Sequence, residues 1–123
     1  MATLADRVYD NGLTVLDTEA NRIDITSQEA TTYTEATSTY TLGNSTSLSI
    51  GAPTDGDTSG RKVTAAAISD GSVSSTGTAT HFAVVDTSNS RLLATGSLSA
   101  SQSVTSGNTF TLAAFDIEIP DPA

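Results

Sequence analysis

The stretch "THFAVVDTSNSRLLATGSLS", residues 80–99, decides the fold class. Two runs of strand-forming residues, "THFAVVD" and "RLLATGSL", flank the polar tetrapeptide "TSNS". Valine, phenylalanine and threonine suit the pleated, half-buried surface of a sheet, whereas serine and asparagine are typical of turns. The stretch therefore predicts two antiparallel strands joined by a short turn.

The same scheme of short strand and turn continues on both sides of this stretch. "RIDIT" (22–26) and "AFDIEIP" (114–120) alternate apolar with charged residues, and the proline ends the second run because it has no amide hydrogen to pair. Turn dipeptides such as "DG" at 70–71 separate the runs between them. This pattern predicts an all-β fold over a single domain, 1–123: an antiparallel β-sandwich of jelly-roll or immunoglobulin-like type.

One short helix is expected near the N-terminus. Leu13, Leu16 and Ala20 have helical spacing and predict a helix over 12–20, with Asn11 as its N-cap. Residues 1–11 would then form an N-terminal arm.

Two further segments are expected to lie outside the sheets. Residues 27–46 show no period and are interpreted as a long loop with room for one helical turn, which makes them the first candidate for a contact arm. Residues 119–123 are expected to form a C-terminal tail. The candidate partner-contact residues are Tyr9, Tyr33, Tyr40, Arg61 and Lys62.

Composition excludes several kinds of partner. The chain has 14 acidic and 5 basic residues, a net charge of −9, so it lacks the basic stripe that binds nucleic acid or an anionic membrane. It has no cysteine, so neither disulfides nor thiolate chemistry is available. "MATLADRVYDNG" has acids where a secretory signal would have a basic segment and an apolar run, so synthesis in the cytoplasm is expected.

A catalytic triad is the first enzymatic hypothesis, because residues 80–99 hold the only histidine. His81 and Asp86 are five residues apart on one extended segment, so they face opposite sides of the sheet, about 15 Å or more apart. The chain also lacks the Gly-x-Ser-x-Gly elbow that presents a nucleophilic serine. The pattern favours an ordinary strand position for His81.

Two further groups of residues have the composition of a functional site. Asp55, Asp57 and Ser59 have the spacing of a calcium loop, but Ala66 stands where its closing glutamate is needed, so a polar turn is favoured over a metal site. The carboxylates that a glycosidase would need are expected to lie on solvated strand faces; they are Asp24, Asp116 and Glu118. No cofactor motif is present in the sequence, and we expect a protein that is not an enzyme.

Several segments resemble a family of small virion structural proteins of tailed phages and prophages. The likeness covers residues 11–123, and its most specific pieces are "TTYTEATSTYTLG" (31–43), "TSGRKVT" (58–64), "VDTSNSRLL" (85–93) and "FDIEIPDPA" (115–123). The family pattern tends to have proline where Ala30 stands, which affects the geometry expected for that loop. The resemblance carries over no catalytic residues.

The resemblance implies a component of the virion. Within it we expect a capsid decoration or cement protein, located on the capsid surface and docked non-covalently on the major capsid protein and on copies of itself, with a trimer as one arrangement. A tail, collar or fibre component that binds a host surface is the alternative. A tail-associated polysaccharide hydrolase is the third hypothesis.

Overall fold

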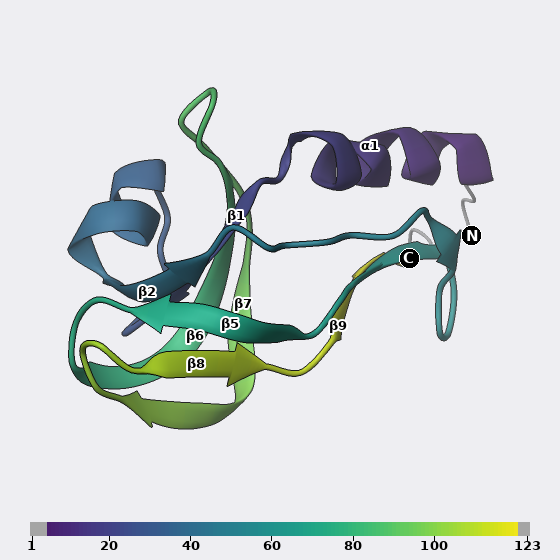
Figure 1. Cartoon of the computed structure of the whole chain (residues 1–123). Helices are drawn as coiled ribbons and strands as arrows, with labels where there is room; N and C mark the ends of the chain where they lie inside the picture. Colours follow the sequence, from purple (N-terminus) through teal and green to yellow (C-terminus); the bar gives the residue numbers. More distant parts are fainter. Residues whose placement is uncertain (1–4, 121–123) are drawn as a thin grey trace. The chain divides into compact units, whose positions relative to one another are not determined.

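The computed structural model describes residues 5–120 of the 123-residue chain (Figure 1). Contacts within the chain group these residues into two compact units. Unit 1 holds the described residues up to Glu19, Ser49–Ala67, and those from Ala113 onward, and unit 2 holds Ala20–Leu48 and Ile68–Leu112. That the chain forms a single domain stays a prediction.

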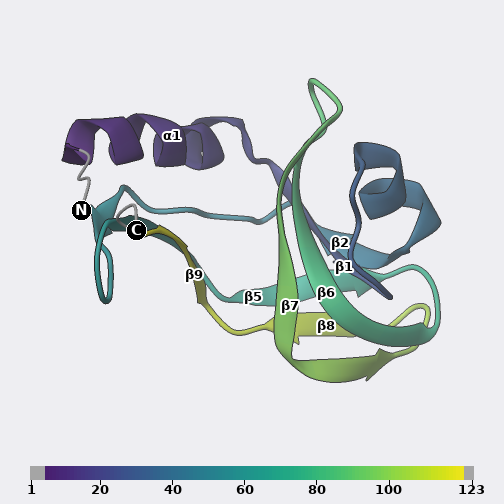
Figure 2. The same ribbon diagram turned by 180° about the vertical axis from the view of Figure 1, so that it is seen from behind.

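Unit 2 is a six-stranded antiparallel sheet with the strand order β7-β6-β1-β2-β5-β8 (Figures 1 and 2). Its strands are β1 (Arg22–Thr26), β2 (Thr41–Ser45), β5 (Ile68–Val73), β6 (Gly77–Asp86), β7 (Arg91–Val104) and β8 (Thr109–Leu112). Asp86 pairs with Arg91 across the turn at 87–90. The pair of strands predicted from residues 80–99 is therefore confirmed.

The sheet of unit 2 is curled. The register of β6 against β7 shifts between Ala79 and His81 and again between Val84 and Val85. Such irregularities bend a strand and increase its twist. As a result the two edge strands approach each other, and Nε2 of Gln102 on β7 donates a hydrogen bond of 2.9 Å to the carbonyl oxygen of Thr111, which lies on β8.

The inner face of the curled sheet forms the core of unit 2. Alternate positions along the strands supply its side chains, as the period of two requires. The buried residues of this face include Ile23, Ile25, Ile68, Val73, Val84, Phe110 and Leu112.

The outer face of β1 and β6 is also covered. Two small residues of the segment 27–40, Ala30 and Ala36, pack against Ala83 and Val85 of β6. Three larger side chains flank this cluster: Tyr33, Tyr40 and Leu92. The segment therefore covers the sheet of unit 2.

The prediction of a long loop over 27–46 is wrong for its second part, because Thr41–Ser45 form β2, which pairs with β1 and β5 inside the sheet. The helical turn expected in this segment is present as the π-helical turn η1, Glu35–Thr39. The missing period has a physical cause: the buried positions of 27–40 are filled by alanines, and Ala36 is 0% exposed. The segment is packed and is not an extended arm.

Unit 1 is a three-stranded antiparallel sheet, in the order β3-β4-β9, with the helix α1 (Asp6–Glu19) against β4. Its strands are β3 (Thr54–Asp55), β4 (Arg61–Ala65) and β9 (Phe115–Ile119). The helix buries Tyr9, Leu13 and Leu16, which share one face by their spacing. Val63 and Ala65 of β4 are fully buried, and they share a face with Arg61, which reaches the helix.

The helix begins six residues earlier than the sequence predicts. It starts at Asp6, so residues 6–11 are helical and the predicted arm is wrong there, while residues 1–4 lie outside the described part. Asn11 lies inside the helix and is not its N-cap. The predicted tail, 119–123, is described only to residue 120; its first residue, Ile119, ends β9, and 121–123 lie outside the described residues.

The predicted fold class is confirmed. The chain is mainly β, its sheets are antiparallel and curled in a sandwich-like manner, and it has one short N-terminal helix.

Candidate docking surface

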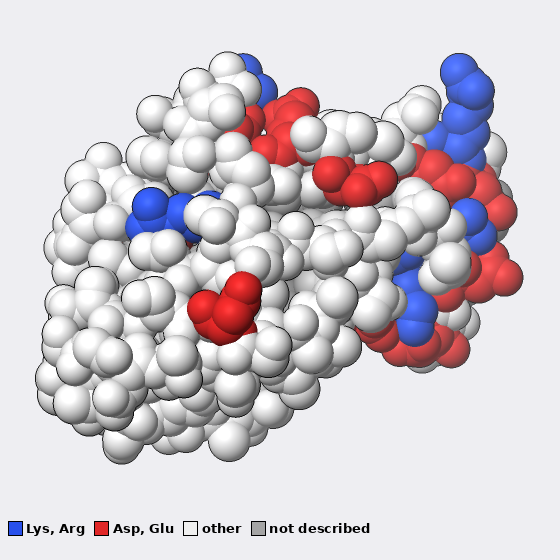
Figure 3. All heavy atoms as spheres, in the orientation of Figure 1, with Lys and Arg blue, Asp and Glu red and all other residues white. Residues whose placement is uncertain are grey.

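The ion pairs of unit 1 centre on two adjacent basic residues of β4, Arg61 and Lys62. Figure 3 shows charged side chains gathered over unit 1, whereas the visible surface of unit 2 is mostly uncharged. Successive residues of a strand point to opposite faces, so the two bases serve different sides of the sheet. Unit 1 therefore has a charged contact on each face.

Arg61 ties the helix to the sheet. Its Nε lies 2.9 Å from Oδ1 of Asp10 on α1, and its Nη1 lies 2.7 Å from Oδ1 of Asp55 at the end of β3. Asp6 contributes a longer contact of 3.9 Å. The hydrogen bond with Asp10 is the main cause that raises the pKa of Arg61 above its ordinary value.

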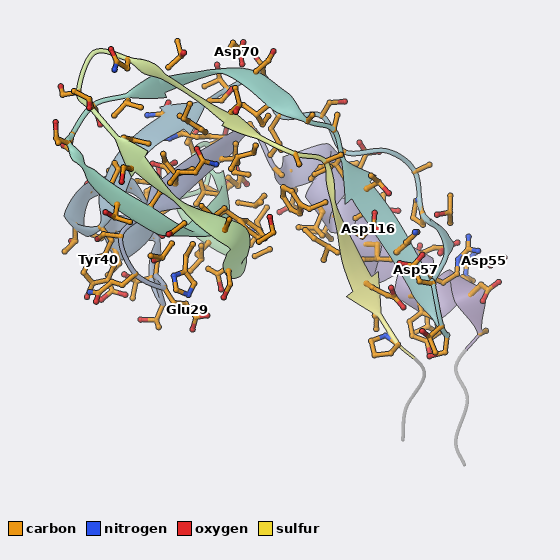
Figure 4. The ribbon with its side chains drawn as sticks, turned by 90° about the horizontal axis from the view of Figure 1, so that it is seen from below. Glu29, Tyr40, Asp55, Asp57, Asp70 and Asp116 are labelled. Carbon is orange, nitrogen blue, oxygen red and sulfur yellow. The ribbon has the colours of Figure 1, made fainter. Side chains whose placement is uncertain are left out.

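Lys62 holds the face that α1 does not cover, here termed the open face. The register of β4 with β9 places Lys62 opposite Glu118 and Thr64 opposite Asp116 on this face. Nζ of Lys62 lies 2.6 Å from Asp57 and 3.0 Å from Asp116. Figure 4 labels these two acids on unit 1. The hydroxyl of Thr64 donates to Oδ1 of Asp116 at 2.7 Å.

These contacts shift the pKa of both partners. The hydrogen bonds from Lys62 to Asp57 and then to Asp116 raise the pKa of Lys62 to about 12. The hydroxyl of Thr64, and after it Lys62, lowers the pKa of Asp116. The open face therefore holds one base, Lys62, which contacts two acids, Asp57 and Asp116, and lies opposite a third, Glu118, in the register of the strands.

The outer edge of β9 is the feature that sequence reasoning missed. The amide of Gly51 donates to the carbonyl of Thr64, so the backbone groups of Thr64 point away from β9. Thr64 and Asp116 are therefore a non-hydrogen-bonded pair, and the backbone groups of Asp116 point away from β4. Because the pattern alternates along the strand, the backbone groups of Glu118 also point away from β4. Within residues 5–120, β9 pairs with β4 alone, which leaves a regular strand edge.

The five predicted contact residues do not form one surface. Tyr9 is 2% exposed and lies on the buried face of α1. Tyr33 and Tyr40 pack onto the sheet of unit 2. Arg61 and Lys62 are exposed by 16% and 20% and are held in ion pairs. Of the predicted set, only the two basic residues adjoin the candidate surface.

The segment weighed as a calcium loop, residues 55–60, is a closed turn. The amide of Gly56 donates to the carbonyl of Gly60 at 3.0 Å, and Gly60 has a φ of 69°, which glycine adopts readily. Asp55 binds Arg61 and Asp57 binds Lys62, so the two carboxylates are directed to opposite faces of β4. Among residues 5–120, no group of three or more histidine, aspartate or glutamate side chains is placed to hold a metal ion.

The structure gives His81 and Asp86 separate surroundings. Asp86 accepts hydrogen bonds from the amide of Ser88 and from Nδ2 of Asn89, so it caps the turn at 87–90. The bond from Asn89 is the main cause that lowers its pKa. Nδ1 of His81 lies 2.8 Å from the hydroxyl of Thr80. The two residues thus stand in different hydrogen-bond networks.

The prediction that Asp24 lies on a solvated face is wrong. Its side chain is 0% exposed and forms two hydrogen bonds with Arg22, at 2.7 and 2.8 Å. The hydroxyl of Thr41 on β2 adds a third bond at 2.6 Å. The carboxylate is buried because the cover of residues 27–40 lies over this face, which the strand alternation alone could not reveal.

Comparisons with known proteins return no match: no protein-family model, no curated protein and no solved structure resembles the chain closely enough to report. Within the described residues, the structure contains no helix long and apolar enough to span a membrane.

Proposed function

We propose that this chain is a structural protein of a tailed-phage particle, namely a decoration protein that docks non-covalently on the capsid lattice. The edge of β9 that has no partner strand among residues 5–120 carries the proposal. An exposed strand edge allows a neighbouring chain to add a strand through main-chain hydrogen bonds. Such pairing joins subunits without covalent bonds, and β9 lies within 115–123, a segment from which the sequence predicts the resemblance to virion proteins.

The chemistry of the chain fits this role. It has no cysteine, which suits assembly in a reducing cytoplasm. Its net charge of −9 disfavours binding to DNA, as a protein on a capsid exterior requires. Docking on a lattice would add to its stability by mass action, because the lattice binds only the folded chain.

The test is the number of copies in purified particles. Quantitative gel densitometry against the major capsid protein should give a stoichiometry set by the lattice. Particles stripped of the chain should lose heat resistance and regain it when the purified chain is added back. A few copies per particle would instead indicate a tail or fibre component, and absence from particles would overturn the proposal.

A further inference from the structure

We propose that the edge of β9 selects one kind of partner: a strand of a lattice subunit in which basic or hydroxyl residues alternate with apolar residues. The identity of the subunit rests on the proposed function. The chemistry of the strand rests on unit 1 alone, and it follows from the backbone and the side chains of β9.

The backbone offers a complete pairing site. The amides and carbonyls of Asp116 and Glu118 point outward, as the pairing of Thr64 with Gly51 requires. The register of β9 with β4 runs from Phe115 to Ile119 without an irregularity, so the strand has no bulge that would turn its edge away. An incoming strand can therefore form two pairs of main-chain hydrogen bonds.

The side chains of β9 indicate which residue types the incoming strand should have. On its paired side, Glu118 lies opposite Lys62, Asp116 opposite Thr64, and Ile117 opposite Val63. β4 thus shows the kind of strand with which β9 pairs, one in which a basic, an apolar and a hydroxyl residue follow one another. Directly opposed residues of opposite charge stabilise strand pairing, and like charges weaken it.

Charge also excludes the edge of a second copy. If β9 paired with another β9, the acids of the two strands would meet on the open face, which already holds Asp57. A strand with lysine, arginine or threonine on the open face would instead complete it. The apolar residues between them would continue the side that carries Ile117 and packs toward the helix.

Amide hydrogen exchange of the full chain tests this directly. The probe is the capped peptide TKVKVT, and the matched control is TEVEVT. At a peptide concentration about ten times Kd, mass action predicts about tenfold slower exchange of the Asp116 and Glu118 amides. The control peptide should leave both amides unchanged. Equal protection by both peptides, or no protection by either, would overturn the proposal.

Substitutions at Glu118 separate the backbone from the side chain. Glu118→Pro removes an outward amide but no hydrogen bond to β4, and it should abolish protection at Asp116 while unit 1 stays folded by circular dichroism. Glu118→Ala keeps the amide and should retain part of the protection. Glu118→Lys also keeps the backbone amide of residue 118, so it tests the charge argument even if the proline variant fails to fold. It should shift the binding preference toward TEVEVT. An unchanged preference would contradict the charge argument.

The two proposals fail in different ways. If the chain is abundant in particles but its edge does not bind the lysine peptide, the chain docks through another surface and this inference is wrong. If the edge binds the peptide but particles lack the chain, the edge chemistry stands and the virion role is wrong.

Discussion

At the scale of single residues, two aromatic rings of unit 2 lie across glycines of neighbouring strands. Phe110 covers Gly71, and Phe82 covers Gly96, its partner in the register of β6 and β7. Neither glycine has a positive φ, so space and not backbone conformation requires it. The ring shields backbone that the missing side chain leaves bare, a known device in sheets.

Gly71→Ala should therefore overpack the core of unit 2. The added Cβ would overlap the ring of Phe110, and such overpacking costs about 1–3 kcal/mol. Urea denaturation should show the loss in the free energy of unfolding. Gly51→Ala is the matched control, because its Cβ would meet nothing closer than 3.9 Å. Equal stability of the two variants would contradict the packing argument.

The buried ion pair is the second residue-scale feature. Asp24→Ala leaves Arg22 and the Thr41 hydroxyl without their common acceptor, and we expect a loss of about 2–4 kcal/mol, since removing one member of a buried pair strands the other. Thermal unfolding followed by circular dichroism measures it. Asp17→Ala, at an exposed position of α1, should change the stability little. A small effect at Asp24 would show that water reaches Arg22 readily.

At the scale of elements, α1 contains a residue that opposes its own helix. Gly12 lies in the interior of α1, where glycine costs about 1 kcal/mol relative to alanine. Its added Cβ would meet only Cδ1 of Ile119, at 3.9 Å. Gly12→Ala should therefore raise the melting temperature of unit 1.

The opposite sign is expected for the same substitution at Gly107. Its φ of 90° is a conformation that side chains rarely adopt, so Gly107→Ala should destabilise by about 1 kcal/mol although nothing lies within 4 Å. Differential scanning calorimetry on both variants checks the pair. If both substitutions changed the melting temperature in the same direction, helix propensity at Gly12 and the positive φ at Gly107 would not explain their effects.

How far the sequence predicts the elements depends on the size of the buried residues. The alternation in β1, β6 and β9 is carried by large aliphatic and aromatic side chains, and there the predicted strands are confirmed. The segment 27–40 buries alanine, which gives no apolar period to read, so its cover of the sheet was missed. The start of α1 was missed because Gly12 interrupts the stripe that begins at Tyr9.

The candidate surface was only half predictable for a related reason. Arg61 and Lys62 stand out in a chain with few bases, and they do adjoin the surface. That β9 is an edge depends on strand pairing between residues more than 50 positions apart, as in the 52-residue separation of Thr64 and Asp116. Local alternation carries no information on such pairing.

At the scale of the whole molecule, acidic groups dominate the response to pH. Hydrogen bonds lower the pKa of Asp70, Asp86 and Asp116 in the folded chain. A lowered pKa contributes stability that is present above the unfolded value, about 3.9 for aspartate, and is lost as the pH falls through the folded value. Lys62 affects stability at alkaline pH. The stability that its raised pKa contributes is fully present below a pH of about 10.4 and is lost as the pH rises through about 12.

Stability should therefore fall steeply below about pH 4. Asp116→Asn should be less stable than the natural chain at pH 7, and the difference should close as the pH is lowered through the folded pKa of Asp116. Guanidinium denaturation midpoints between neutral and strongly acidic pH measure this. Asp17→Asn should track the natural chain throughout. A gap that persists at the acid end would assign the effect of Asp116→Asn to packing.

The adjacent bases of β4 have a consequence for how the chain finds its correct alignment. Arg61 needs acids on the helix side and Lys62 needs acids on the open side. If β4 slipped by one residue against β9, every side chain would exchange faces, and both cations would lose their anchors at once. The dipeptide thus helps to fix the register of β4 against β9, because the alignment shifted by one residue would lose the ion pairs of both Arg61 and Lys62.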